Sequence, residues 1–478
     1  MIKINLNDMQ YRYDVYHIVK LFFDFSSIEF VAEDCDYKVD IYDNRLNISS
    51  GNDVKEFLFD ESFTIKEEVK KAVFKYFSTR TNKELPWGTL IGIRPSKIAM
   101  KMLEQGKNYD DIIRYFNDAY LTRRDKAKLC IEVAENEKKY LNTNSNMVSI
   151  YIGMPFCPTR CLYCSFASNP IHKSKELIIP YLETLKYEIT QISRYIDDKG
   201  LKIQSVYFGG GTPTSVNDEN FEEIMETISK YFVLNRDIQE FTVECGRPDS
   251  ITINKLQTMK RYSVDRININ PQSMNDETLR LIGRNHTCYD IIEKYEMARS
   301  LGFDNINMDI IVGLPGEKLS HIENTCEKIL KLKPDSLTVH GLSIKRASRL
   351  YENIINNLRY EIPKQHELNK MYERTAKLAY DLSMKPYYMY RQKNMVGNME
   401  NIGYSLEGKE CIYNIEMIED KQTIIALGAD SVSKVVYNST AKIERFGNVK
   451  DIKEYVNRID EMVKNKLKLL DSFVREEL

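Results

Sequence analysis

The stretch YIGMPFCPTRCLYCSF, residues 151–166, places three cysteines in the spacing C-x3-C-x2-C at Cys157, Cys161 and Cys164. The apolar run before the first cysteine is typical of a buried strand, so the three thiols lie on the loop that follows it. A compact loop can direct three thiolates at one small cluster. A four-iron cluster bound by three cysteines leaves one iron without a protein ligand, and that open iron can accept a chelating small molecule.

Two other interpretations of the triplet are a structural zinc site and a chance grouping of core cysteines. A structural zinc ion normally takes four protein ligands, and the nearest candidate for a fourth is His172. A chance grouping is disfavoured by the Pro and Arg between the cysteines. The six remaining cysteines are dispersed, as reduced core residues are, at positions 35, 130, 245, 288, 326 and 411.

Length and composition restrict the class of protein. The 478 residues exceed one ordinary core and predict two or three domains. The net charge of −2 gives no general basic surface, so we expect no nucleic-acid partner. The sequence has no run of about 18 apolar residues, so we expect no membrane span. The N-terminus lacks the basic and apolar regions of a secretory signal, so we expect a cytoplasmic protein.

From about residue 147 onward, strand-like apolar runs alternate with amphipathic helices. This repeated βα pattern predicts an α/β fold, a parallel sheet covered by helices, with enough units for a partial (β/α) barrel. We expect strands at 147–156, 204–210, 240–246, 266–273, 305–315 and 335–344. We expect the helices between them at 176–196, 219–232, 253–262, 288–302 and 321–333.

The flanking regions have a different pattern. Strand-like alternation and helical spacing over residues 1–85 predict a small α+β unit, and three helices are expected at 96–105, 108–117 and 122–141. The polar break at Thr143–Asn146 marks a boundary. We therefore expect an N-terminal α+β and helical domain at 1–145, the partial barrel at 146–345, and a C-terminal α+β domain at 346–478 that covers the mouth of the barrel.

Polar residues follow successive predicted strands. The glycines of FGGGTPT, residues 208–214, allow backbone groups to approach a ligand closely, although the same residues also suit a plain tight turn. Glu244 ends a strand, where a carboxylate can bind a cofactor amine or ribose or can simply face solvent. Gln272 and Arg284 flank the next loop and helix start. Asp309 lies within an apolar strand, where a carboxylate is costly unless it is paired or liganded.

The cysteine spacing, the aromatic strand before it and Tyr163 before the last cysteine resemble the radical S-adenosylmethionine superfamily. Residues 151–343 resemble, more narrowly, the oxygen-independent coproporphyrinogen III dehydrogenase (oxidase) family. WGTLIGIRPSK (87–97) and YRQKNMVGNMENIGY (390–404) resemble the variant branch of that family that has an added N-terminal domain.

This resemblance implies a 4Fe–4S cluster on Cys157, Cys161 and Cys164, and two molecules of S-adenosylmethionine in one site. The cluster-bound molecule would contact Tyr151, Gly210 and Glu244. The second would be surrounded by Tyr163, Gly211, Thr212, Gln272, Arg284 and Asp309. Two positions depart from the family pattern. Phe166 stands where close relatives have a fourth cysteine, and residues 391–394 lack the His of haem-carrying relatives.

The function that the resemblance implies is anaerobic oxidative decarboxylation of coproporphyrinogen III in haem biosynthesis. A radical enzyme that acts on haem or another tetrapyrrole and a non-enzymatic haem-delivery protein are the alternatives. The expected partners are a tetrapyrrole substrate and a reduced donor such as flavodoxin or ferredoxin, and we expect a monomer. Five further residues are candidates for the substrate site, either at a strand end or as partners of substrate carboxylates: His340, Arg346, Arg349, Arg391 and Lys393.

Overall fold

The structure is a computed structural model that describes residues 1–23, 27–92, 94–141, 144, 146–356, 358–392 and 395–477. The chain divides into two compact units. The first comprises residues 1–134, 364–370 and 390–400, and the second comprises residues 135–363, 371–389 and 401–478. The division into domains at 1–145, 146–345 and 346–478 stays a prediction. Two residues of its first boundary, Thr143 and Ser145, lie outside the described residues.

The first unit contains a five-stranded sheet in the order β2-β1-β3-β4-β5. β1 is parallel to β2 and β3, while β3, β4 and β5 form an antiparallel meander. The predicted α+β unit is confirmed. Its strands and helices are β1 (Ile2–Leu6), α1 (Arg12–Val19), β2 (Ile28–Phe30), β3 (Tyr37–Ile41), β4 (Arg45–Ser50), β5 (Asp53–Leu58) and α2 (Ile65–Thr81).

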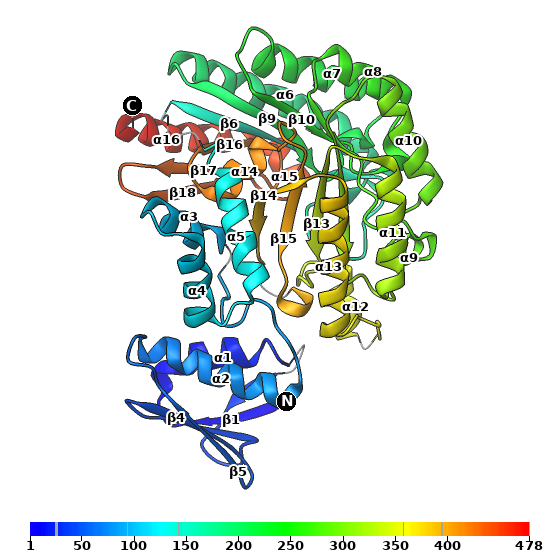
Figure 1. Cartoon of the computed structure of the whole chain (residues 1–478). Coiled ribbons are helices and arrows are strands. Elements are labelled where there is room, and N and C mark those ends of the chain that lie inside the picture. The colour runs from blue at the N-terminus through cyan, green and yellow to red at the C-terminus, as the bar shows by residue number, and fades with distance from the viewer. Residues whose placement is uncertain are drawn as a thin grey trace. The chain divides into compact units, whose positions relative to one another are not determined.

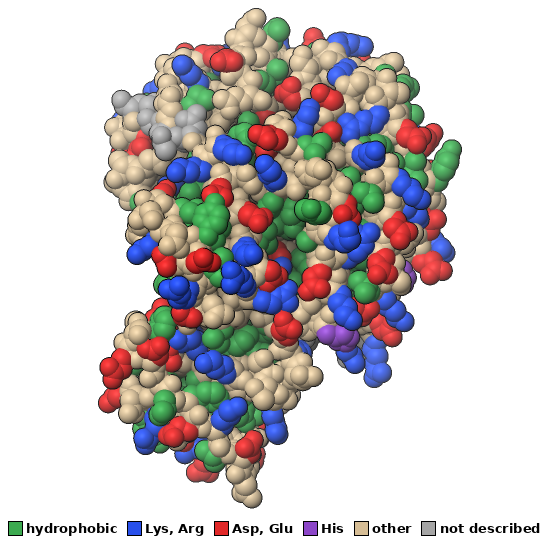
Figure 2. Space-filling model, in the orientation of Figure 1, with side chains coloured by type: hydrophobic (Ala, Val, Ile, Leu, Met, Phe, Trp, Pro, Cys, Tyr) green, Lys and Arg blue, Asp and Glu red, His purple; other side chains and the backbone are tan. Residues whose placement is uncertain are grey.

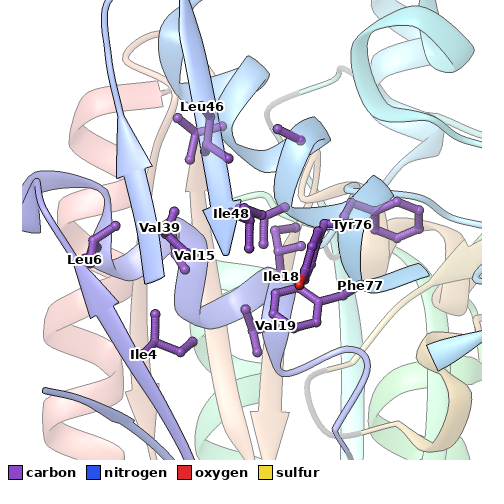
Figure 3. Close-up of a cluster of buried hydrophobic side chains, with 14 of the residues drawn as sticks. Ile4, Leu6, Val15, Ile18, Val19, Val39, Leu46, Ile48, Tyr76 and Phe77 are labelled. Carbon is purple, nitrogen blue, oxygen red and sulfur yellow. The ribbon is translucent and has the colours of Figure 1, made fainter. Parts of the chain in front are cut away.

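The core of this sheet forms because alternate strand residues meet the apolar faces of α1 and α2. Figure 3 shows Ile4, Val39 and Ile48 from the strands pointing toward Ile18 and Phe77 from the helices, and all five are buried. The capping box formed by Thr64 and Glu67 fixes the start of α2. The N-terminal unit therefore has a hydrophobic core of its own.

Three further helices of the first unit confirm the helices expected between residues 96 and 141. They are α3 (Ser96–Glu104), α4 (Tyr109–Tyr120) and α5 (Arg124–Glu137), and the last three residues of α5 extend into the second unit. The buried Trp87 donates from Nε1 to Glu400 at 2.7 Å, and Lys126 donates to the same carboxylate at 2.5 Å. The two family-like segments, 87–97 and 390–404, thus meet through a buried polar contact.

The second unit is built on an eleven-stranded sheet of the described residues, in the order β14-β15-β13-β12-β11-β10-β9-β6-β16-β17-β18. The run from β13 to β16 is parallel throughout. Helices line the outer side of this curved run of strands (Figure 1). The predicted α/β class and partial (β/α) barrel are therefore confirmed.

The six expected strands and five expected helices of the barrel are all present. The strands are β6 (Met147–Met154), β9 (Lys202–Gly210), β10 (Glu240–Glu244), β11 (Arg266–Asn268), β12 (Ile306–Val312) and β13 (Ser336–Gly341). The helices are α6 (Lys175–Asp198), α7 (Asp218–Ile228), α8 (Ile253–Arg261), α10 (Cys288–Ser300) and α11 (Leu319–Leu332). A short helix that the sequence pattern does not predict, α9 (Asp276–Leu281), follows β11.

The C-terminal region completes both edges of the sheet. β16 (Thr423–Leu427) is parallel to β6, and β15 (Asn401–Ser405) is antiparallel to β13. The tail of the chain forms two helices, α15 (Ile452–Asn457) and α16 (Ile459–Glu477), which are divided at Arg458. The remaining elements are β7 (Phe156–Cys157), β8 (Asn169–Pro170), α12 (Arg349–Ile355), α13 (Gln365–Asp381), β14 (Lys385–Tyr390), α14 (Ile412–Glu419), β17 (Val432–Tyr437) and β18 (Lys442–Gly447).

A buried ion pair attaches the C-terminal helix to the barrel. Lys466 of α16 donates to Glu188 of α6 at 2.5 Å, and both side chains are fully buried. The same carboxylate accepts from Tyr455 at 2.6 Å, from Asn448 at 2.9 Å and from the backbone of Gly428 at 2.8 Å. A buried charge is tolerated when its oxygens are satisfied in this way.

The surface carries charges of both signs. On the face that Figure 2 shows, Lys and Arg side chains are interspersed with Asp and Glu, and the two signs nearly balance over the whole sequence, which has a net charge of −2. Within the part of the chain that the structure describes, no helix is long and apolar enough to cross a membrane.

Candidate functional site

The three predicted ligand cysteines lie on the loop after β6, residues 155–168, called here the cysteine loop. Cys157 and Cys161 are buried, and Cys164 is partly exposed. The loop is held against the barrel by Leu162, which donates to the Ile282 carbonyl at 2.9 Å, and by the Thr159 hydroxyl, which donates to the Gly283 carbonyl at 2.8 Å. The thiols therefore have a fixed backbone.

Burial has a strong effect on the thiols. It raises the pKa of Cys157 to about 12, against the opposing effect of a hydrogen bond from the Thr212 hydroxyl. A thiolate is stable here only if a positive partner, such as iron, offsets the cost of burying it. No three His, Cys, Asp or Glu side chains of the described residues are placed to hold a single metal ion. A 4Fe–4S cluster does not require that arrangement, because each cysteine binds a different iron.

The glycine turn after β9 packs directly on the cysteine loop. The backbone N–H of Gly211 donates to the Met154 carbonyl at 2.6 Å, and that of Thr212 donates to the Phe156 carbonyl at 2.8 Å. A Cβ on Gly211 would lie 2.6 Å from the Phe156 carbonyl oxygen and 3.0 Å from the sulfur of Cys157. Gly210 has φ +102°, in the region that favours glycine. This close approach requires glycine at both positions.

Glu244 lies at the end of β10 beside a group of aromatic side chains. It accepts a short hydrogen bond from Tyr207. The rings of Tyr207 and Tyr413 stack with centroids 4.4 Å apart, and Tyr151 stacks 6.2 Å from Tyr207. Burial raises the pKa of Glu244 to about 7; the Tyr207 hydrogen bond opposes this shift, and the charge of Asp309 adds to it. Tyr151 and Glu244, both predicted contacts of the cofactor, are thus neighbours.

Asp309 of β12 is held by three polar groups. It accepts from Asn307 at 2.6 Å, its backbone N–H donates to Asn270 at 3.2 Å, and His340 Nε2 lies 3.6 Å from its Oδ2. Burial acts to raise the pKa of Asp309, but the interaction with His340, the hydrogen bond from Asn307 and the charge of Arg266 together outweigh burial, so the pKa is lowered. The expectation that a carboxylate in this strand needs partners is confirmed.

Gln272 has an unusual backbone and an unsatisfied side chain. Its φ is +64°, and its main chain bridges β12 through Asp309 and Ile311 at 2.8 and 2.9 Å. Its Oε1 is buried and has no hydrogen-bond partner among the described residues. A buried polar atom of this kind costs free energy unless a ligand supplies a donor. The atom therefore fits a cofactor-binding position.

Arg284 joins the cysteine loop to the ends of the strands. It donates to the Tyr163 hydroxyl at 3.1 Å and to the carbonyls of Gly246 and Asn270, both at 2.7 Å. Together with the contacts above, these three hydrogen bonds connect nearly all the predicted residues into one site at the C-terminal side of β6, β9, β10 and β12. What each residue binds stays a prediction.

The other candidate residues are placed as follows. His340 joins the site through Asp309. Arg346 and Arg349 are exposed after β13, and Phe166 is 67% exposed with Lys345 over its ring at 5.7 Å. Arg391 belongs to the first unit, where it is buried over the Trp87 ring at 4.8 Å and donates to the backbone of Leu90 and Asn398. Lys393 and Asn394 lie outside the described residues.

Sequence reasoning missed three polar residues next to the cysteine loop. Arg247, Asp249 and His286 lie on loops after β10 and before α10 and contact one another. The available signal was the Arg-Pro-Asp sequence directly after a strand, at the edge of the sheet where the site lies.

Comparison with known proteins identifies the family. The model of the radical SAM superfamily matches residues 151–329. The oxygen-independent coproporphyrinogen-III oxidase-like protein HemZ of Bacillus subtilis is 40% identical over 410 residues, which cover 85% of this chain and 81% of that protein. The chain belongs to the oxygen-independent coproporphyrinogen III oxidase-like family. The recognition made from the cysteine motif is therefore confirmed.

Two other similarities are informative. The heme chaperone HemW of Bacillus subtilis is 33% identical over 48% of this chain and 58% of its own length. The solved structure of coproporphyrinogen III oxidase (HemN) from Escherichia coli superposes with a TM-score of 0.50 at 19% identity, over 71% of this chain and 73% of that one, and it shows the shared fold. As a member of the radical SAM superfamily, this protein uses a 4Fe–4S cluster and S-adenosylmethionine.

Proposed function

We propose that this protein is a cytoplasmic radical S-adenosylmethionine oxidoreductase that converts two propionates of coproporphyrinogen III to vinyl groups, giving protoporphyrinogen IX. The observation that carries the proposal is the 40% identity with the oxidase-like protein over four-fifths or more of both chains. The cysteine loop and the strand-end residues support it, because they form one connected site in the barrel.

The cofactors supply the reactive chemistry. A cluster held by Cys157, Cys161 and Cys164, together with bound S-adenosylmethionine, would supply the hydrogen-atom abstraction from a propionate side chain. The propionate then loses CO2 and one electron to a one-electron acceptor, which leaves the vinyl group. A reduced donor such as flavodoxin or ferredoxin supplies the electron that starts each round.

The chain's own residues bind and orient these groups. We assign the cluster to Cys157, Cys161 and Cys164. Contacts to the cluster-bound S-adenosylmethionine are assigned to Tyr151, Gly210 and Glu244. A second molecule is assigned to Tyr163, Gly211, Thr212, Gln272, Arg284 and Asp309. The unpartnered Oε1 of Gln272 supports the last assignment, and the burial of the strand ends excludes water from the reacting centre.

The experiment is an anaerobic assay of the reconstituted protein with a chemical reductant, S-adenosylmethionine and coproporphyrinogen III. The proposal predicts that added coproporphyrinogen III increases deoxyadenosine formation and that mass spectrometry detects the divinyl product. Matched reactions without tetrapyrrole and with haem are the controls. Absence of the divinyl product from protein with a complete, reducible cluster contradicts the proposal.

A second candidate is binding or modification of haem, which the 33% identity with the heme chaperone favours. Phe166 in place of a fourth cysteine also separates this chain from the close oxidase relatives. Deoxyadenosine formation that increases with haem and not with coproporphyrinogen III supports a haem-modifying enzyme. Tight haem binding without cofactor cleavage supports a haem-delivery protein.

A further inference from the structure

Arg247 lies against a cysteine of the cysteine loop. The residue is almost wholly buried, with 3% of its surface exposed. Its Nη1 donates to the sulfur of Cys161 at 3.6 Å and to the hydroxyl of Thr159, inside the same loop, at 3.0 Å. A guanidinium therefore faces one of the three predicted iron ligands, and its position is not assigned by the motif that identifies the family.

The guanidinium is held in this orientation from behind. Asp249 accepts two parallel hydrogen bonds, from Nε at 2.9 Å and from Nη2 at 2.7 Å. His286 Nδ1 lies 3.6 Å from the same carboxylate, and Arg284 donates to His286 Nε2 at 3.4 Å. The fork onto Asp249 uses two nitrogens and leaves the third directed at the sulfur, so the positive end of the ion pair faces Cys161.

We propose that Arg247, oriented by Asp249, is a positioning residue that makes the 4Fe–4S cluster easier to reduce. Reduction adds negative charge to the cluster and its thiolates. A buried N–H donor and a fixed positive charge next to one ligand sulfur stabilise that added charge, and hydrogen bonds to the sulfurs are among the factors that set the potentials of such clusters. The proposal rests on the cofactor and is independent of which tetrapyrrole is the substrate.

The ion pair permits a test in which the two partners have opposite effects. Arg247→Gln removes the positive end and leaves the Asp249 carboxylate near the cluster, so reduction becomes harder. Asp249→Asn removes the negative end and leaves the guanidinium, so reduction becomes easier. The double variant has a neutral pair, so its cluster is expected to have a reduction potential between those of the two single variants. Disorder of the loop alone does not produce shifts of opposite sign.

The measurement is an anaerobic redox titration of the reconstituted full-length protein without tetrapyrrole, followed by electron paramagnetic resonance, with iron content determined on each sample. At a fixed potential, Arg247→Gln is expected to lower the ratio of reduced to oxidised cluster at least tenfold, which corresponds to 59 mV for a one-electron couple. Asp249→Asn is expected to raise the ratio.

The matched control uses Arg123, which forms the same fork onto Asp125 two residues later, at 2.6 and 2.8 Å, in the other compact unit. Arg123→Gln and Asp125→Asn are expected to leave the potential unchanged. Shifts of the same sign in Arg247→Gln and Asp249→Asn, or no shift with a full iron content, overturn the proposal.

Variants that fail to assemble the 4Fe–4S cluster also test the proposal. If Arg247→Gln does not assemble the cluster, Asp249→Asn decides by itself, and an unchanged or lowered potential overturns the proposal. If neither variant assembles it, the ion pair is required for folding of the loop and the proposal is wrong. Because no tetrapyrrole is present, none of these results depends on the proposed decarboxylation.

Discussion

Substitution of Gly211 by alanine tests the packing of the glycine turn on the cysteine loop. The new Cβ would lie 2.6 Å from the Phe156 carbonyl oxygen, 2.8 Å from the Met154 carbonyl oxygen and 3.0 Å from the sulfur of Cys157. Ordinary contacts begin at 3.4 Å, so the turn and the loop must separate by about 0.8 Å at the closest point. Two of the three obstacles are backbone atoms, which cannot rotate away.

The free-energy cost of Gly211→Ala has two parts. Overpacking of this kind typically costs about 1–3 kcal/mol. Separation also weakens the hydrogen bonds from Gly211 and Thr212 to the same two carbonyls, each worth about 1 kcal/mol. If the binding geometry can be restored only by taking up about 3 kcal/mol of this strain, cofactor binding weakens roughly a hundredfold, at 1.4 kcal/mol per factor of ten.

The assay measures iron and sulfide per chain and the equilibrium binding of S-adenosylmethionine after anaerobic reconstitution. Gly211→Ala is expected to lose both cluster content and cofactor affinity. Gly92→Ala is the matched control, because a Cβ at that position meets no atom within 4 Å. A Gly211→Ala protein with full iron content and native affinity would refute the packing argument.

Three other predictions concern stability and binding. Lys466→Met is expected to destabilise the second unit by about 3–5 kcal/mol in chemical denaturation, because it leaves Glu188 buried without its cation, and the double variant with Glu188→Gln should cost less. Burial raises the pKa of Glu244 from 4.5 to about 7, so the native protein should lose up to about 3 kcal/mol of unfolding free energy as pH rises from 4.5 to 7. Glu244→Gln should abolish that loss. Identical profiles of stability against pH for the native protein and the variant would contradict the raised pKa of Glu244. Gln272→Met removes a buried oxygen that has no partner among the described residues, so the unfolding midpoint should not fall while S-adenosylmethionine affinity does; unchanged affinity would remove Gln272 from the site.

Most of the barrel was predictable because its periodicity is local. Each strand such as β6 or β12 is a short apolar run between amphipathic helices, and this pattern specifies βα units without knowledge of their partners. β16 and β17 were not predicted, because a short apolar run such as TIIAL does not distinguish a strand from a buried helix. The pairing of β16 with β6, more than 270 residues earlier in the chain, depends on tertiary contacts.

The site was predictable for a related reason. Parallel strands end at the same edge of the sheet, so polar residues after successive strands are neighbours even when they are far apart in sequence. That rule located Glu244 and Gln272, whereas Asp309 was located because a carboxylate within an apolar strand needs a partner. The same rule covers Arg247, which follows β10, but it does not indicate that Arg247 contacts Cys161, because that contact depends on how the loop after β10 folds against the cysteine loop. His286 precedes a helix, so the rule does not apply to it.

The most direct test of the cluster assignment is electron paramagnetic resonance of the reduced, reconstituted protein with and without S-adenosylmethionine. We predict the signal of one reduced 4Fe–4S cluster per chain and a change in its shape when S-adenosylmethionine binds the open iron. Alanine at Cys157, Cys161 or Cys164 should abolish the signal, and alanine at the buried Cys245 should retain it. A signal that survives loss of Cys161, or that S-adenosylmethionine does not alter, would contradict the account.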